Sequence, residues 1–172
     1  LWDVTTGDRT HSSAMHGAEV KSVCFYSRNV WVSGGLDGVV AAWDDRTPTK
    51  KIFSLDHGAP VECLTIGDDL AASAGGHKVT LWDLGQQRRA HDFEDAHSKS
   101  ASCVSFCSGG SRLLSGGADC VLKAHSLKDW SSTRVARFDS PLLCVDCSSE
   151  DLLFAVGTAS GRVEARLRVT GT

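Results

Sequence analysis

A histidine, a serine, an aspartate and a tryptophan recur as a set along this 172-residue sequence. The first set comprises His16, Ser33, Asp37 and Trp43. Histidine, serine and aspartate are the side chains of a hydrolytic triad, in which histidine activates serine as a nucleophile and the order along the chain is free. A domain needs one nucleophile, however, and this set is repeated. The repetition favours a structural role over catalysis, so we expect no enzymatic activity.

The later copies of the set lose members progressively. The members retained in the second and third copies are His57, Ser73, Trp82, His97, Ser115 and Asp119. His77 lies near the aspartate position of the second copy, and His125 stands at the tryptophan position of the third. In the fourth copy, Val156, Ser160 and Arg166 occupy the serine, aspartate and tryptophan positions. We expect apolar packing to stabilise the fourth copy, because each hydrogen bond contributes only about 1 kcal/mol.

The spacing of the set indicates the elements that must position it. Trp2, Trp43 and Trp82 are separated by 41 and 39 residues, and the three histidines of the set by 41 and 40. Small and apolar residues alternate over short segments between turns, and no segment has the periodicity of a long helix. Repeats of about 40–45 residues with four strands each are typical of β-propeller blades.

The expected strands follow this period. They are 20–25, 29–33, 38–43 and 49–54, then 61–66, 70–74, 78–82 and 88–93, then 101–106, 112–116, 120–125 and 133–138, and finally 142–147, 152–157 and 162–168. Gly34-Gly35, Gly75-Gly76 and Gly116-Gly117 lie between second and third strands, where we expect positive φ angles. The fold class is therefore predicted to be all-β, a β-propeller of about four blades.

The predicted blade limits are approximately 16–55, 57–95, 97–139 and 140–170. Residues 1–3 repeat the Trp-Asp ending of a blade, so we interpret them as the end of a preceding, fifth blade. The sequence starts without methionine at this point, and we expect it to be a fragment of a larger ring.

Seven cysteines raise the question of disulfides or a metal site. Cys63, Cys103 and Cys144 recur at one point of successive first strands, so we interpret them as small buried residues. Cys144 and Cys147 form a C-x-x-C pair, but residues three apart in a strand point to opposite faces. We therefore expect no metal, no cofactor and a reducing compartment.

Charge and hydropathy restrict the partners. The net charge of −3 neither requires nor excludes a polyanionic partner. No apolar run reaches the roughly 20 residues of a membrane helix, and we expect no membrane association. Arg162, Arg166 and Arg168 share one face of the last expected strand with Glu164. Two interpretations of this face stay open, namely solvated or ion-paired charge at a blade seam, or a contact to a partner or to RNA phosphate.

The set of His, Ser, Asp and Trp resembles the structural tetrad of WD-repeat proteins, and we call it the tetrad. In that family the four side chains form a hydrogen-bond chain that ties the loop before the first strand to the second and third strands. The resemblance implies a WD-repeat β-propeller ring of seven blades, of which this chain supplies about four. It also implies that the tetrad residues are structural.

A narrower resemblance is to nucleolar WD-repeat proteins of the small-subunit processome. The stretches that carry it are 57–62 with 73–76 and 79–84, 112–119, and 138–143 with Val156, Gly157 and Gly161. The resemblance implies a non-enzymatic scaffold in small-subunit ribosome biogenesis, located in the nucleus and nucleolus. It further implies that the partners are protein subunits of a large ribonucleoprotein assembly and pre-ribosomal RNA, with no small-molecule substrate.

Two hypotheses from other functional classes stay open. Trp43-Asp44-Asp45-Arg46 matches the W-D-x-R pattern of WD-repeat substrate receptors of cullin–RING ubiquitin ligases, with Asp44 and Arg46 at the blade rim. An enzyme is supported by the tetrad alone.

Overall fold

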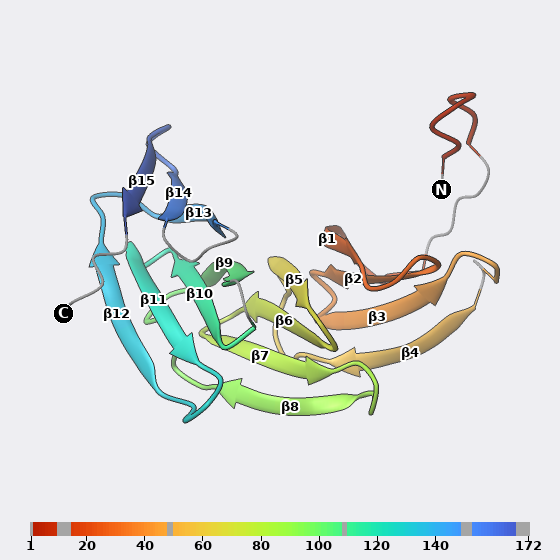
Figure 1. Ribbon diagram of the computed structural model, residues 1–172, viewed down its shortest axis with the longest axis horizontal. Helices are drawn as coiled ribbons and strands as arrows, with labels where there is room; N and C mark the ends of the chain where they lie inside the picture. The colour runs from red at the N-terminus through yellow and green to blue at the C-terminus, as the bar shows by residue number, and fades with distance from the viewer. Residues whose placement is uncertain (1, 10–14, 48–49, 108–109, 149–152, 168–172) are drawn as a thin grey trace.

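The strands of the chain form four antiparallel sheets that lie side by side in an open arc (Figure 1). The computed structural model describes residues 2–9, 15–47, 50–107, 110–148 and 153–167. These residues contain no helix, and therefore none long and apolar enough to cross a membrane. The predicted all-β propeller architecture is confirmed.

We call the four sheets blades 1 to 4. Blade 1 comprises β1 (Val20–Phe25), β2 (Val30–Gly35), β3 (Val39–Asp44) and β4 (Lys51–Asp56). Blade 2 comprises β5 (Cys63–Gly67), β6 (Leu70–Gly75), β7 (Lys78–Asp83) and β8 (Arg88–Phe93). Blade 3 comprises β9 (Ala101–Phe106), β10 (Arg112–Gly117), β11 (Val121–Ser126) and β12 (Ser132–Arg137). Blade 4 comprises β13 (Leu142–Cys147), β14 (Leu153–Thr158) and β15 (Val163–Leu167).

Most strand boundaries lie within two residues of the prediction. β5 begins at Cys63 rather than at 61, because Val61 N–H donates to the Gly35 carbonyl of blade 1 and is used to join the blades. Predicted strand residues 49, 152 and 168 lie outside the described residues, as does Leu1. Trp2 forms an isolated bridge with Arg9, and the assignment of residues 1–3 to a preceding blade stays a prediction, as do the blade limits.

The hydrophobic core lies between blades rather than within them. Three clusters of buried side chains each combine residues of two neighbouring blades. Val40 of blade 1 packs with Leu64 and Trp82 of blade 2, and Leu122 of blade 3 packs with Leu142 of blade 4. A blade thus buries its apolar faces only against its neighbours, at roughly 25 cal/mol per Å² of apolar surface removed from water.

The glycine pairs serve close contact rather than turn geometry. In the turns between the second and third strands of blades 1 to 3, positive φ occurs at Gly38 (76°), Gly76 (56°) and Cys120 (64°). The prediction was therefore right for Gly76 and wrong for the other five glycines. A Cβ on Gly117 would lie 2.6 Å from His97 Nδ1, and one on Gly75 would overlap the Pro60 carbonyl oxygen. Glycine is needed there because the tetrad histidine and the incoming chain pack directly on the strand.

The cysteine prediction was wrong for Cys144. Cys103 is buried in the cluster between blades 3 and 4, and Cys63 is half-buried, but Cys144 is exposed. Cys144 lies on β13, at the end of the arc, where the described residues form no further blade to cover it. None of the seven cysteines, all of which the structure describes, forms a disulfide.

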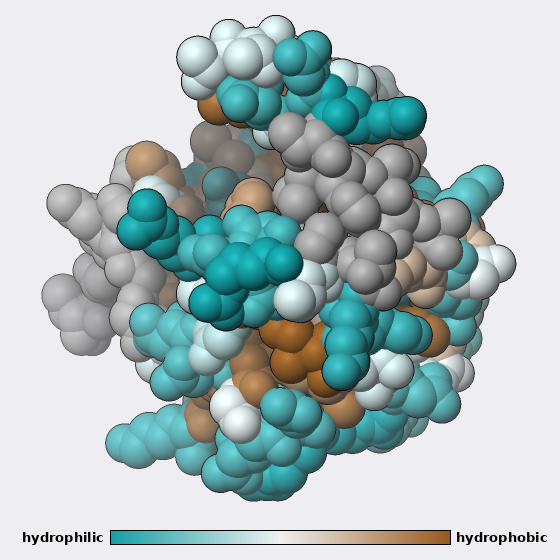
Figure 2. Space-filling view, turned by 90° about the vertical axis from the view of Figure 1, so that its right-hand side faces the viewer, coloured by the Kyte–Doolittle hydropathy of each residue, from teal (hydrophilic) through white to brown (hydrophobic). Residues whose placement is uncertain are grey.

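Both ends of the arc present apolar side chains. Val23 and Phe25 on β1 are 60% and 69% exposed, and Leu143 and Val163 are exposed on blade 4. Figure 2 views the molecule from the side of blade 1, where apolar surface lies between polar side chains. By strand register, Val23 corresponds to Leu64 and Val104, and Val163 corresponds to Val40 and Leu122, and these counterparts are all buried at the inner seams.

We expect the isolated 172-residue chain to self-associate through these faces. Light scattering after size-exclusion chromatography should show oligomers, and the double substitution Val23→Lys and Phe25→Lys should shift the population towards monomer. Ile52→Lys, on the exposed outer strand β4, serves as the control and should change nothing. A wild-type chain that stays monomeric and does not bind a hydrophobic dye would contradict this expectation.

Candidate functional site

The tetrad of blade 1 is a continuous hydrogen-bond chain. His16 precedes β1, Ser33 lies on β2, Asp37 in the β2–β3 turn and Trp43 on β3. His16 Nδ1 lies 3.0 Å from the Asp37 carboxylate, and His16 Nε2 lies 2.7 Å from Ser33 Oγ. Trp43 Nε1 donates to the same Oγ over 2.8 Å. The chain ties the loop before β1 to the second and third strands.

The direction of the donors follows from the carboxylate. Asp37 can only accept, so His16 donates from Nδ1, its Nε2 accepts from Ser33 O–H, and Ser33 Oγ accepts from Trp43. Burial raises the pKa of Asp37, but bonds from His16 and from the Gly17 and Val39 N–H groups more than offset it, and the pKa is lowered.

This arrangement has the hydrogen-bond connectivity of a hydrolytic triad, but its serine is not exposed to a substrate. Ser33 is 1% exposed, and the indole N–H of Trp43 occupies one of its two lone pairs. A nucleophile must reach a carbonyl carbon in substrate. Ser33 lines a cavity of about 410 Å³ together with His16 and Trp43, but it is itself almost fully buried. The geometry supports a structural role, in which the tetrad fixes the loop before β1 to β2 and β3.

Blade 2 retains the hydrogen-bond chain of the tetrad, but the imidazole ring of His57 is flipped relative to that of His16. His57 Nδ1, not Nε2, lies 2.8 Å from Ser73 Oγ, and Trp82 Nε1 donates to Ser73 over 2.8 Å. His57 Nε2 instead lies 3.2 Å from the Gly75 carbonyl oxygen, which takes the role of the missing aspartate as acceptor. His77, at the aspartate position in sequence, does not meet His57 and bonds the His97 carbonyl of blade 3 at 3.1 Å.

Blade 3 replaces tryptophan by a second histidine. His97 Nδ1 lies 3.0 Å from Asp119 Oδ1, and His97 Nε2 lies 2.8 Å from Ser115 Oγ. His125 Nε2 lies 2.7 Å from the same Oγ, and its Nδ1 lies 2.7 Å from Ser132 Oγ. With Ser115 donating to His97, His125 must donate from Nε2 and accept from Ser132 at Nδ1.

An aromatic cluster fills the space beside this smaller side chain. Phe93 of blade 2 lies 4.6 Å from His125 between ring centroids, and His91 lies 4.7 Å from Phe93. Trp130, which has a φ of 58°, stacks on His91 at 4.3 Å. Sequence reasoning missed this cluster, although a tryptophan outside the repeat spacing five residues after His125 was a visible signal.

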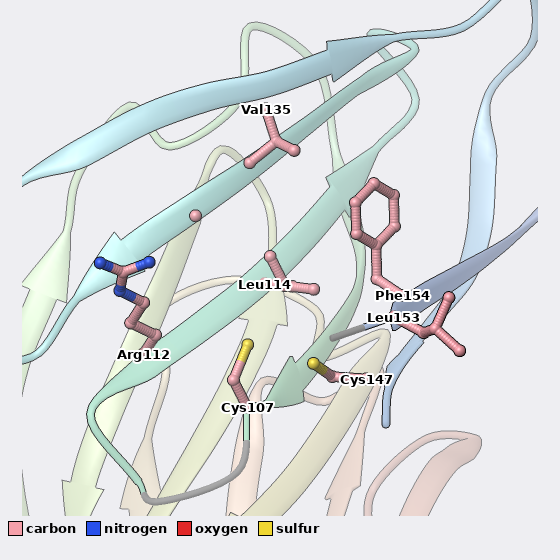
Figure 3. A pocket seen from close by; sticks show the side chains of 8 residues that line it. Cys107, Arg112, Leu114, Val135, Cys147, Leu153 and Phe154 are labelled. Atoms are coloured by element: carbon pink, nitrogen blue, oxygen red, sulfur yellow. The ribbon is translucent and has the colours of Figure 1, made fainter. Parts of the chain in front are cut away.

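Blade 4 lacks a tetrad and is attached to blade 3 by apolar packing and by hydrogen bonds from Ser102 to the Leu142 carbonyl and from Ser105 to Asp146. Val156 is buried at the serine position, and Ser160 Oγ lies 3.0 Å from Thr158 Oγ1 instead of joining a tetrad. Figure 3 shows the seam with blade 3, where Leu114 and Phe154 border a cavity of about 100 Å³.

The basic face of β15 is partly engaged. Arg166, at the tryptophan position, places its guanidinium 5.2 Å from the Phe138 ring centroid and donates to Glu164 Oε2 over 3.1 Å. Arg162 precedes the strand and is exposed. Arg168 lies outside the described residues.

The W-D-x-R segment forms a closed turn. Arg46 donates to the two Asp44 carboxylate oxygens from Nε (2.9 Å) and Nη2 (2.6 Å). These side-chain bonds lower the pKa of Asp44 to about 2. Elsewhere, the described residues contain no group of three His, Cys, Asp or Glu side chains that could hold a metal ion.

A sequence model of the WD domain, G-beta repeat matches residues 7–44 and 88–126. Three curated relatives share one description, U3 small nucleolar RNA-associated protein 15. The Xenopus laevis homolog is 28% identical over 98% of this chain and 33% of its own length. The Schizosaccharomyces pombe protein is 30% identical over 98% of the chain and 35% of its own length. The Homo sapiens homolog is 29% identical over 68% of the chain and 23% of its own length.

The chain therefore spans about a third of the length of the first two of these relatives. Their similarity runs from blade 1 through the degenerate blade 4, because it covers nearly the full chain.

We expect Asp119→Ala and Asp37→Ala each to lower the free energy of unfolding by about 1–3 kcal/mol, since each leaves a histidine and two N–H groups without their acceptor. Ser160→Ala should change it by less than about 0.5 kcal/mol, because Ser160 is exposed. Urea denaturation measures all three. Equal losses at the three positions would show that the tetrads do not stabilise the blades.

We also expect stability to fall in mild acid. Burial lowers the pKa of His57 and His97 and takes that of His125 from 6.5 to about 3. Below pH 6.5 the unfolded chain binds protons that the folded chain excludes, so stability is complete above pH 6.5 and declines as the pH falls towards 3. Each excluded proton contributes a slope of about 1.4 kcal/mol per pH unit.

His125→Gln should reduce this slope between pH 7 and pH 5, since the amide can bond both serines but does not titrate. His77→Gln, at an exposed histidine, is the matched control and should leave the slope unchanged. Unfolding curves at several pH values measure it, and an unchanged slope in His125→Gln would contradict the account.

Proposed function

Since this chain is a WD-repeat protein similar to U3 small nucleolar RNA-associated protein 15, we propose that it acts in small-subunit ribosome biogenesis as a non-enzymatic scaffold. The observation that carries the proposal is the similarity over 98% of the chain, which includes a blade without a tetrad. A match limited to WD motifs would not extend through blade 4.

The buried tetrads support the non-enzymatic part of the proposal. Ser33, Ser73 and Ser115 are the central serines of the three tetrads, and all three are buried. Each also accepts from a tryptophan or a second histidine. The same bonds that would define a triad are used to hold a blade together.

We propose that contacts with other protein subunits place the chain in a ribonucleoprotein assembly in the nucleolus, and that RNA contacts are secondary. A net charge of −3 is low for an autonomous RNA-binding domain. Arg162, Arg166 and Arg168 remain the proposed basic contact to pre-ribosomal RNA or an acidic partner. Because Arg166 already covers Phe138 and pairs with Glu164, Arg162 is the better probe of this face.

A cullin–RING substrate receptor is the second candidate. The observation in its favour is that the Arg46 side chain is 69% exposed directly after Trp-Asp-Asp. The bidentate pair with Asp44 satisfies that guanidinium within its own turn, which favours a structural use of the motif.

Depletion of the endogenous protein tests the two candidates together. We expect precursor and mature small-subunit ribosomal RNA to show a processing defect, with large-subunit RNA nearly unchanged, when both are measured by pulse labelling. Re-expressed wild-type protein should restore processing. Arg162→Glu should restore it less well than Arg88→Glu, an equal charge change on an exposed outer strand.

Normal ribosomal RNA processing after complete depletion would overturn the proposed function. If a cullin–RING complex were lost at the same time, and Arg46→Ala alone reproduced that loss, the receptor function would replace it.

A further inference from the structure

Two cations lie directly opposite each other on blade 3. Lys123 of β11 and Arg134 of β12 are cross-strand partners in the antiparallel ladder. Among the described residues, neither takes part in an ion pair. Like charges at directly opposed positions destabilise a sheet, so folding alone does not favour this pair.

The other blades show which residues stand opposite each other at the corresponding third-strand position, although a bulge precedes this pair in blade 3 and follows it in blades 1 and 2. Blade 1 has Ala41 opposite Ser54, and blade 2 has Thr80 opposite Asp92. In blade 2 the Thr80 hydroxyl donates to Asp92 over 2.5 Å, and Arg89 and Lys78 pair with the same carboxylate. Blade 1 thus has a neutral pair at these positions, and blade 2 has a hydrogen-bonded pair. Blade 3 differs from both, because its pair consists of two cations.

The cations line an open groove between blades 2 and 3. The groove has a volume of about 610 Å³, and its described lining also includes His77, Asp95, His97, Ser98, Asp119 and Val121. Asp119 accepts from His97, from the Ser98 N–H and from the Val121 N–H, and is therefore already committed to the tetrad. Asp95 is the other carboxylate of the lining, and among the described residues no ion pair joins it or Asp119 to Lys123 or Arg134, so both cations can still bind a ligand.

The charge of Lys123 reaches the buried histidines of the seam. After burial and the charge of His97, the charge of Lys123 is the next cause of the lowered pKa of His125. Burial is the largest cause of the lowered pKa of His97; the hydrogen bond and charge of Asp119 oppose it, and the charge of Lys123 adds to it. The ammonium group thus acts on the seam between the blades.

We propose that the Lys123–Arg134 pair binds phosphate groups of single-stranded RNA. A phosphodiester backbone offers closely spaced unit charges that two neighbouring cations can neutralise. The described lining is polar apart from Val121, and it has no aromatic or large aliphatic anchor of the kind that carries protein interfaces. Only the choice of RNA as the polyanion rests on the proposed function.

The test uses the full-length protein and a fluorescent oligouridylate of about 20 nucleotides, titrated at about 50–200 mM salt. The variant Lys123→Thr with Arg134→Asp copies the hydrogen-bonded pair of blade 2, so the fold should be retained, which thermal unfolding checks. We expect roughly tenfold weaker binding at low salt. The slope of log affinity against log salt should fall by about 1.4, since each neutralised phosphate on a single strand contributes about 0.7.

Lys51→Thr with Arg88→Asp is the matched control, because it makes the same charge change on exposed outer strands of blades 1 and 2. Equal effects of the two double variants would overturn the proposal. A defect of the Lys123 and Arg134 variant with polyglutamate but not with RNA would also overturn it, and would assign the groove to an acidic protein.

Ultraviolet crosslinking of wild-type protein to the same RNA provides a measurement that needs no variant. Crosslinked peptides should map to β11, β12 or the facing blade 2 turn that contains His77, and crosslinks confined to other blades would contradict the site. Normal ribosomal RNA processing after depletion would overturn the proposed function but would leave this binding result in place, so the two failures are distinguishable.

Discussion

Each blade of this chain has apolar faces that it cannot bury alone, and the packing of one blade against the next is the interaction on which the remaining structure depends. Each of the three buried clusters is built from two blades. The packing is close enough to dictate residue size: a Cβ on Gly34 would lie 2.7 Å from Val61 Cγ1, and one on Gly116 would lie 2.9 Å from Leu142 Cβ. Where the arc ends, the same kinds of position become exposed, as Cys144 shows.

The tetrads tolerate substitution because each position requires only a hydrogen-bond donor or acceptor, which more than one chemical group can supply. The central serine has one hydrogen and two lone pairs, so it can serve one acceptor and receive from one or two donors. The Gly75 carbonyl replaces an aspartate as acceptor, and His125 Nε2–H replaces an indole N–H as donor. Val156 can do neither, and blade 4 depends on packing and on hydrogen bonds that Ser102 and Ser105 of blade 3 donate to the Leu142 carbonyl and to Asp146.

The burial of the tetrad serines distinguishes a structural tetrad from a catalytic triad, and it implies that exposed side chains carry the function. A serine that meets its histidine while buried cannot reach a substrate, so the partners of this chain must be met by exposed side chains. Those side chains vary between blades that are otherwise alike. The contrast between Thr80–Asp92 and Lys123–Arg134 at one pair of positions is the clearest case, since the fold accepts either and only the second leaves charge for a ligand.

The sequence by itself determined the repeat length, the all-β class and the order of intact and degenerate blades. Each depends on local periodicity and on the types of residue at fixed spacing, as with His16 and His57. Tertiary structure alone decided which way the His57 ring turns, that His77 bonds the next blade, and that Trp130 stacks on His91 near His125. It also decided that Cys103 is buried while Cys144 is exposed. These outcomes depend on contacts with the neighbouring blade. The sequence pattern within one repeat does not specify how the side chains of the next repeat pack against it.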